Sequence, residues 1–552
     1  MFEILDKDLA GRIGKLYTKT GIIETPALFP VINPQKQTVT LEEIKSIGFR
    51  QIITNSYLIK KNFGDLCTEV GVHNLLQWDL PIMTDSGAYQ LMEYGEVEVD
   101  PDEILKYQID IGTDIGVILD VPTRANTDRE IVFLEVEETL RRARRALLLR
   151  EEYDPEHRTL LVGPVQGGEH VDIVAYSAKK LSEMDFEIYA IGSVTLHLEQ
   201  YNFEKIVDMI IAAKLNLPLG KPVHLFGAGH PLIMPIAVAL GIDMFDSASY
   251  ILYARDDRIM LPDRTLRIED VKIEYIPCCC PVCSKYSVKE LKEMSKDERE
   301  RLIAIHNLHI LKREIEEIKQ RIKEGTLWEY LQEKSAADAR LRRAFIRIVK
   351  LRKILEKLTP TTRGDIHGID ITCILDIARP HIVQHTRKLV NRYVPPHKEI
   401  LLILPDPEEK PYNRSIMFIK VVNVLKNLNM LNRVHICFLS DIFGIVPHEI
   451  SDIYPLAQYE DARYLKCVRN IGKTLTLTYL KSKISNYKII IAMLPKNELE
   501  ELRRTLRSLK VNVKFIGFTL YGPDDKVSID SICSMVLPHV FSALLREPYE
   551  AA

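Results

Sequence analysis

The chain has 552 residues, 46% of them hydrophobic and 27% charged, which is typical of soluble globular proteins with more than one domain. The formal net charge of −3 excludes a uniformly basic protein, so any contact with nucleic acid must come from a local patch. No apolar run approaches the ~20 residues that span a bilayer, and the N-terminal residues lack the apolar segment of a signal peptide. The 9 cysteines are distributed as in proteins whose thiols stay reduced. We therefore expect a cytoplasmic protein without disulfides or membrane contact.

Short apolar runs alternate with helical patterns through the first 250 residues. The expected strands are 22–30, 51–56, 81–85, 116–120, 160–166, 188–192, 222–227 and 244–247. The expected helices between them include 41–47, 101–111, 130–149, 171–183 and 203–214. This alternation predicts an α/β protein with a (β/α)8 TIM barrel, whose active site lies at the carboxyl ends of the strands. A doubly wound open sheet is the alternative, because strands are easily miscounted from sequence.

Polar side chains follow several of these strands at the point where each strand ends. They are Asp85, Asp120, Gln166 and Asp246, and Gly192 ends a further strand. A single aspartate in such a place is most often a turn former or a helix cap. Several on one barrel rim instead indicate a site, because two carboxylates can serve as acid and nucleophile in glycosyl transfer. The third carboxylate and the amide suit the donor and acceptor edges of a planar base.

Cysteines crowd the segment 275–285, Tyr-Ile-Pro-Cys-Cys-Cys-Pro-Val-Cys-Ser-Lys, and His306 follows on a predicted helix. Thiolates and an imidazole in this pattern indicate a structural zinc site with four protein ligands. The alternative is a disulfide or a set of buried free thiols. A metal ion saturated by protein ligands has no open position for substrate, so the chemistry must lie upstream.

Residues 287–357 have a helical period, and a basic amphipathic helix lies near their end. This helix either contacts nucleic-acid phosphates or is a solvated face over the core. The basic side chains considered for phosphate contact are Arg340, Arg342, Arg343, Arg347 and Lys350.

A linker at 359–364 precedes apolar strands at 401–404, 434–439, 488–493 and 513–518, which alternate with helices. This pattern predicts a smaller α/β domain. We therefore expect a catalytic barrel at 1–275, a zinc-binding helical subdomain at 276–358 and a C-terminal α/β domain at 365–552.

Several segments in fixed order occupy about residues 8 to 350. They are Asp85-Ser-Gly-Ala-Tyr-Gln90, Gln166-Gly, His224-Leu-Phe-Gly-Ala-Gly-His-Pro231, Asp246-Ser-Ala-Ser-Tyr250 and the cysteine segment with His306. Together they resemble the archaeal type of tRNA-guanine transglycosylase. The resemblance implies the exchange of guanine at position 15 of the tRNA D loop for 7-cyano-7-deazaguanine (preQ0), on the route to archaeosine.

The resemblance also implies a role for each strand-end side chain. Asp246 matches the nucleophile that attacks ribose C1′, and Asp85 matches the general acid and base for the departing and incoming bases. Asp120 matches the carboxylate that binds the N1/N2 side of the base, and Gln166 matches the amide at its O6 side.

The remaining residues expected to contact the base include two departures from the family. Ser86 and Tyr89 stand in the first motif, where phenylalanine commonly takes the place of Tyr89 and stacks on the base. Gly192 and Ser193 form the loop that closes over the base, where the family often has two glycines. The hydroxymethyl group of Ser193 could narrow the pocket.

The zinc ligands implied by the resemblance are Cys278, Cys280, Cys283 and His306, so Cys279 points away. The implied partners are tRNA, guanine, preQ0 and a second copy of the chain in a homodimer. A typical euryarchaeal relative ends in a PUA RNA-binding domain. We expect none here, so a separately encoded PUA protein would assist tRNA binding.

Other function classes lead to different expectations. A noncatalytic, zinc-containing tRNA-binding subunit would not need both Asp85 and Asp246, and both are present. A metal-dependent barrel hydrolase would need histidine and aspartate ligands at strand ends with an open coordination position. The cysteine-rich site lies after the last barrel strand instead.

Overall fold

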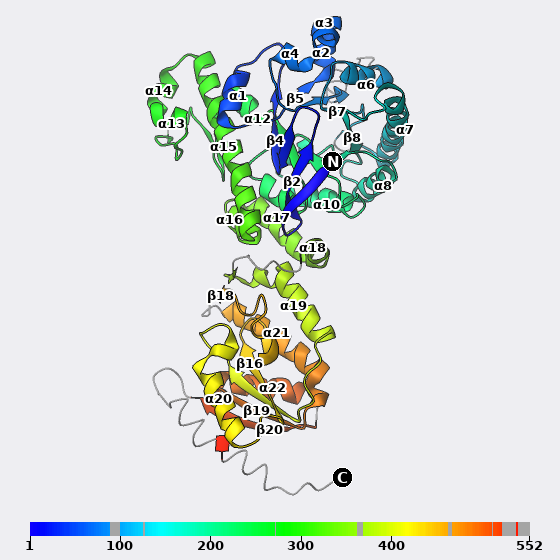
Figure 1. Cartoon of the computed structure of the whole chain (residues 1–552). Helices are drawn as coiled ribbons and strands as arrows, with labels where there is room; N and C mark the ends of the chain where they lie inside the picture. Colours follow the sequence, from blue (N-terminus) through cyan, green and yellow to red (C-terminus); the bar gives the residue numbers. More distant parts are fainter. Residues whose placement is uncertain are drawn as a thin grey trace. The chain divides into compact units, whose positions relative to one another are not determined.

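The computed structural model describes residues 1–88, 100–124, 127–270, 272–360, 368–461, 466–509, 512–520 and 537–538. The chain divides into two compact units (Figure 1). The first comprises Met1–Leu351 with Lys357–Pro360, and the second comprises Arg352–Glu356 with Thr361–Ala552. The finer division of the first unit at residue 275 remains a prediction.

The first unit is built on a closed barrel of parallel strands in the order β10-β11-β4-β5-β6-β7-β8-β9. The strands are β4 (Ala27–Ile32), β5 (Ile52–Asn55), β6 (Ile82–Asp85), β7 (Ile115–Val117), β8 (Leu160–Val165), β9 (Ile188–Ile191), β10 (Val223–Leu225) and β11 (Met244–Ser247). Each overlaps one of the strands predicted from sequence. The TIM barrel is thereby confirmed, and the open sheet is excluded because β11 pairs with β4.

A small antiparallel sheet precedes the barrel. It contains β1 (Phe2–Asp8), β2 (Gly11–Tyr17) and β3 (Ile22–Thr25) in that order. The single strand predicted at 22–30 is therefore two strands, β3 in this sheet and β4 in the barrel. Pro26 separates them, since a proline has no backbone N–H for a strand ladder.

Helices surround the barrel strands (Figure 1). They are α1 (Leu41–Ile47), α2 (Ser56–Phe63), α3 (Asp65–Val70), α4 (Val72–Leu76), α6 (Pro101–Asp110), α7 (Arg129–Tyr153), α8 (Val171–Ser182), α9 (Thr195–Glu199), α10 (Phe203–Lys214), α11 (Met234–Ala239) and α12 (Ser249–Arg255). Their starts follow from capping chemistry. Thr40 and Glu43 form a capping box at α1, and Asp100 accepts from two backbone N–H groups at α6.

The rest of the first unit is helical apart from one hairpin. It contains β12 (Arg258–Met260), β13 (Thr265–Arg267), α13 (Pro281–Lys285), α14 (Val288–Glu293), α15 (Lys296–Glu324), α16 (Leu327–Ser335) and α17 (Ala339–Lys350). The buried side chain of Asn307 on α15 bonds the backbone of Met260, Tyr250 and Arg258. These bonds fix α15 against the chain that leaves the last barrel strand.

The second unit contains a five-stranded sheet in the order β17-β16-β15-β19-β20, parallel except for β17. Its strands are β15 (Ile400–Pro405), β16 (Val434–Ser440), β17 (Gly444–Pro447), β19 (Ile489–Pro495) and β20 (Lys514–Leu520). A short sheet of β14 (Ile369–Ile371) and β18 (Tyr459–Asp461) lies in the same unit. The helical elements are η1 (Ile374–Ala378), α19 (Pro380–Asn391), η2 (Tyr412–Arg414), α20 (Ile416–Asn427), η3 (His448–Ile450), α21 (Lys466–Lys483), η4 (Ile484–Asn486) and α22 (Lys496–Leu509), and α18 (Arg352–Leu358) has residues in both units. The predicted C-terminal α/β fold is confirmed.

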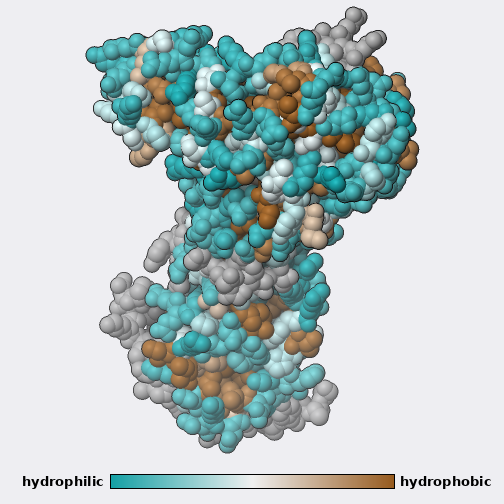
Figure 2. Space-filling model, turned by 45° about the horizontal axis from the view of Figure 1, so that its top comes forward, coloured by the Kyte–Doolittle hydropathy of each residue, from teal (hydrophilic) through white to brown (hydrophobic). Residues whose placement is uncertain are grey.

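The visible surface of both units is mostly hydrophilic, and hydrophobic groups form separate patches (Figure 2). Among the described residues, no helix has the length and apolar character needed to cross a membrane.

Candidate functional site

Asp85 ends β6 at the mouth of the barrel, where its side chain is partly exposed. Its Oδ2 accepts a hydrogen bond of 3.1 Å from Nδ2 of Asn55. Removal from water, reinforced by the negative charge of Asp120, raises the pKa of Asp85 to about 7. A carboxyl group with this pKa is present in both protonation forms at neutral pH, so it can give and take a proton.

Asn55 is a site residue that sequence analysis missed. It ends β5 and is the direct cross-strand neighbour of Asp85 on β6. Its Oδ1 caps α2 by accepting from the N–H of Leu58, which leaves its amide hydrogens facing Asp85. The Asn-Ser pair at a strand end is a capping signal, but only the barrel pairing shows what the amide contacts.

Ser86 follows Asp85 and is fully buried. Its hydroxyl donates a hydrogen bond of 3.3 Å to the backbone carbonyl of Ile118 in the loop after β7. This contact joins neighbouring strand ends. Tyr89 lies outside the described residues, so its predicted contact with the base stays a prediction.

Asp120, Gln166 and Ser193 form a hydrogen-bonded chain across three strand ends. Nε2 of Gln166 donates to Oδ2 of Asp120, and the hydroxyl of Ser193 donates to Oε1 of Gln166 over 2.6 Å. The hydroxyl of Ser193 in turn accepts from the N–H of Thr123 over 3.0 Å. Burial raises the pKa of Asp120 to about 6, and the bond from Gln166 opposes the rise. Near neutral pH Asp120 is therefore mostly ionised and can accept hydrogen bonds.

The loop after β9 is shaped around Gln166. A Cβ atom at Gly192 would overlap Nε2 of Gln166, so a larger residue there would displace the amide. Ser193 has a φ of +59°, a left-handed conformation that glycine adopts without strain. Its hydroxyl orients the Gln166 amide, a role that the sequence did not predict.

Asp246 lies on β11, and one of its carboxylate oxygens accepts two hydrogen bonds. Oδ1 accepts from the backbone N–H of Gly227 over 2.8 Å and from Nε2 of His224 over 2.9 Å. Among the described residues, Oδ2 receives no hydrogen bond. Because the side chain is 14% exposed, the free oxygen can be reached from the barrel mouth.

His224 on β10 is fully buried and lies next to the rings of Phe29 and Phe226. Its Nδ1 has no hydrogen-bond partner among the described residues. A proton on this nitrogen would be a buried, unpaired donor, so the geometry favours the tautomer with the proton on Nε2. That tautomer donates to Asp246. The sequence motif contained His224, but only the barrel register brings it beside Asp246.

The basic side chains predicted to contact tRNA lie on α17, which packs against α10 and α16. Several are engaged within the protein: Arg340 pairs with Asp338, Arg343 with Glu204 and Arg347 with Asp208, and Arg342 donates to the hydroxyl of Ser335. These contacts reduce the positive charge that α17 offers to a polyanion. A contact of Arg340, Arg342, Arg343, Arg347 or Lys350 with tRNA stays a prediction.

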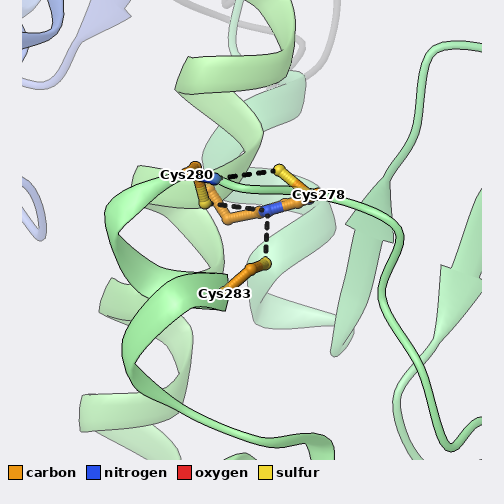
Figure 3. A group of neighbouring side chains, drawn as sticks. Cys278, Cys280 and Cys283 are labelled. Carbon is orange, nitrogen blue, oxygen red and sulfur yellow. Dashed lines mark hydrogen bonds between the residues drawn. The ribbon is translucent and has the colours of Figure 1, made fainter.

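The predicted metal ligands come together near the start of α13 (Figure 3). Nδ1 of His306 on α15 lies 3.4 Å from Sγ of Cys280 and 3.2 Å from Sγ of Cys283, and Cys278 completes the group. Nε2 of His306 donates to the carbonyl of Met260 over 2.8 Å, which leaves Nδ1 free for a metal ion. The group can hold a metal ion with four protein ligands.

A parallel barrel whose strand ends bring together three carboxyl groups and an amide defines a barrel enzyme with its active site at the carboxyl ends of the strands. A family model described as queuine tRNA-ribosyltransferase matches residues 7–340. A second model, described as a domain of unknown function (DUF5591), matches residues 382–534.

Three curated relatives share the name tRNA-guanine(15) transglycosylase. The Pyrobaculum aerophilum protein is 49% identical over 83% of this chain and 90% of its own length. The Sulfolobus acidocaldarius protein is 41% identical over 83% and 88%, and the Methanocaldococcus jannaschii protein is 40% identical over 89% and 74%. The chain belongs to the queuine tRNA-ribosyltransferase family, as the sequence motifs predicted, and this family is one of tRNA-guanine transglycosylases.

Proposed function

We propose that the chain exchanges guanine at position 15 of tRNA for preQ0 through a covalent intermediate on Asp246. The proposal rests on two carboxyl groups at the same barrel mouth that differ in pKa and in hydrogen bonding. Asp85 has a pKa of about 7, and among the described residues one oxygen of Asp246 accepts two hydrogen bonds and the other accepts none. The names of the relatives support the position in tRNA, and the motifs support preQ0.

In the first half-reaction, Oδ2 of Asp246 attacks ribose C1′ and the bond from C1′ to N9 of guanine breaks. The bonding electrons leave with the guanine, which takes the proton of Asp85. Asp120 accepts from the N1 and N2 hydrogens of the base, and Gln166 lies at its O6 side. Because the target base is stacked in tRNA, it must first be flipped into the pocket.

In the second half-reaction, preQ0 enters the pocket that guanine has left. Its N9 attacks C1′ as the bond to Asp246 breaks, and its proton passes to the carboxylate of Asp85. Both aspartates return to their starting forms, so no cofactor is consumed.

We propose zinc for the group of Cys278, Cys280, Cys283 and His306. Three thiolates and one imidazole are a donor set that structural zinc takes. The ion would fix the fold and leave the reaction to the barrel. The homodimer, the cytoplasmic location and an auxiliary PUA protein remain proposals from the family resemblance.

The proposed function is tested with purified protein, an unmodified tRNA transcript and radiolabelled guanine or preQ0. Label is expected to enter the tRNA, and unlabelled preQ0 added afterwards is expected to displace incorporated guanine label. The matched control is a transcript with adenine at position 15, which should take up no label. Equal uptake by both transcripts would exclude the proposed position, and binding of tRNA without uptake would favour the noncatalytic alternative.

The raised pKa of Asp85 predicts how the first half-reaction depends on pH. The protonated form supplies the proton, and a carboxyl with a pKa of about 7 loses it as the pH rises. The rate of adduct formation should therefore fall about tenfold per pH unit well above pH 7. Single-turnover adduct formation between pH 5.5 and 9 measures this. Asp85→Asn should form the adduct slowly, and its rate should show no change with a midpoint near pH 7. If the midpoint stays near pH 7 in that variant, Asp85 is not the acid.

His224 is expected to act as a positioning residue for Asp246. His224→Leu removes the hydrogen bond to a charged acceptor, worth about 1.5–3 kcal/mol, so adduct formation should slow about 10- to 100-fold. His224→Gln can keep an N–H donor near the same place and should recover most of the rate. Melting temperature and tRNA affinity, measured alongside, should change alike in both variants. Equal adduct rates for Leu and Gln would mean that His224 only fills the barrel.

A further inference from the structure

A second cluster of metal-ligand side chains lies in the C-terminal unit, away from the cysteine segment in sequence. It comprises His435 on β16 with His448 and Glu449 on η3, and their ligand atoms all lie within 4.8 Å of one another. We propose that these three side chains hold a divalent transition-metal ion of the zinc class. The proposal does not depend on the base-exchange reaction.

The sheet topology explains why these residues meet. Strands β16 and β17 run antiparallel, with Cys437 paired to Pro447. Continuing that register by two residues sets His435 opposite Glu449, and η3 begins at His448, where β17 ends. The turn from β17 into η3 therefore brings the imidazole of His448 and the carboxylate of Glu449 to one side of His435.

The donor atoms have the spacing of a metal site. Nε2 of His435 lies 3.2 Å from Oε2 of Glu449, and Nδ1 of His448 lies 3.3 Å from the same oxygen. Metal bonds of about 2.0–2.2 Å at tetrahedral angles place neighbouring donors about 3.3–3.6 Å apart. The cysteine-rich group of the same chain has comparable separations, 3.2 and 3.4 Å between His306 Nδ1 and two sulfurs.

Neighbouring side chains orient His435, the buried ligand, and solvent can reach the site. Nδ1 of His435 lies 2.7 Å from the hydroxyl of Tyr487, and such a second partner fixes which nitrogen faces a metal ion. The hydroxyl of Tyr393 lies 3.2 Å from Nε2 of His435 and 3.4 Å from Oε2 of Glu449. The side chains of His448 and Glu449 are 27% and 32% exposed, so an ion can enter from solvent.

A hydrogen-bonded cluster without metal is the competing interpretation. In it, His435 Nε2 carries a proton for Glu449, and His448 Nδ1 carries one for the carbonyl of Ile436 at 3.2 Å. Metal binding replaces both protons with the ion. Two imidazoles and one carboxylate suit zinc, cobalt or nickel better than magnesium or calcium, which prefer oxygen ligands. Metal content therefore distinguishes the two interpretations.

The experiment measures zinc per chain in the full-length protein after saturation with zinc and gel filtration in metal-free buffer. Two zinc ions per chain are expected, one at the cysteine-rich group and one here. His448→Ala should retain one. The matched control is His397→Ala, an exposed histidine of the same unit outside the cluster, which should retain two. A wild-type content of one, or an unchanged content of two in His448→Ala, would overturn the proposal.

A second variant and a cobalt spectrum distinguish loss of the proposed site from misfolding of the protein. Glu449→Gln keeps the shape of the side chain and can still accept hydrogen bonds, but it is a poor metal ligand, so one zinc is expected at a near-normal melting temperature. With cobalt, the cysteine-rich group gives intense thiolate bands and the proposed site only weak ligand-field bands. Loss of the weak bands alone in both variants is expected; loss of the thiolate bands would assign the missing ion to the cysteine group instead.

Discussion

Asp246→Ala is expected to abolish base exchange, with a loss of at least about 10⁴-fold, because it removes the only attacking atom in the proposed reaction. Oδ1 of Asp246 accepts from His224 and Gly227, and within the part of the chain that the structure describes Oδ2 has no hydrogen-bond partner. The neighbouring carboxyl groups cannot replace it. Asp85 has its raised pKa and its bond from Asn55, and Asp120 is bonded to Gln166.

The measurement is the covalent adduct between protein and tRNA, separated on a denaturing gel. Wild type is expected to form it, and Asp246→Ala is not. Asp120→Asn is the matched control, because it also removes a carboxylate from the barrel mouth but leaves the nucleophile, so it should weaken base binding and still give adduct at high tRNA concentration. A normal yield of adduct with Asp246→Ala would show that another residue is the nucleophile.

Removal of metal from the cysteine-rich group is expected to lower the melting temperature by roughly 10 °C. An ion present at about 1,000 times its Kd contributes about 4 kcal/mol, and each kcal/mol corresponds to about 2–4 °C in a large domain. The physical reason is that an ion in this group would join α13 to His306 on α15, whose buried Asn307 holds the chain after the last barrel strand.

Neighbouring cysteines provide the matched pair for this test. Cys280 is buried in the group and Cys279 is exposed outside it. Cys280→Ser should reproduce the effect of a chelator on the melting curve, whereas Cys279→Ser should melt like wild type and respond fully to the chelator. A chelator that leaves the melting temperature of wild type unchanged would mean that the group contributes nothing to folding.

The barrel was predictable because its strands are buried on both faces. Each is a short apolar run that stands out between amphipathic helices, and the polar residue at its end is visible in sequence. The edge strand β1 was not predicted, because it is largely exposed and carries charged residues instead of an apolar run. The cysteine-rich group was predictable because its ligands are close in sequence and of a distinctive type.

Sequence therefore determined which residues stand at the barrel mouth: Asp85 ends β6, Asp120 and Gln166 follow β7 and β8, and Asp246 lies near the end of β11. The tertiary structure alone decided how they act on one another. The contacts of Asn55 with Asp85 and of His224 with Asp246 join different strands, and Ser193 orients Gln166 from another loop. The physical reason is that hydrogen bonding, and the desolvation and nearby charge that raise the pKa of Asp85, depend on distances across the closed barrel. No spacing along the chain encodes those distances.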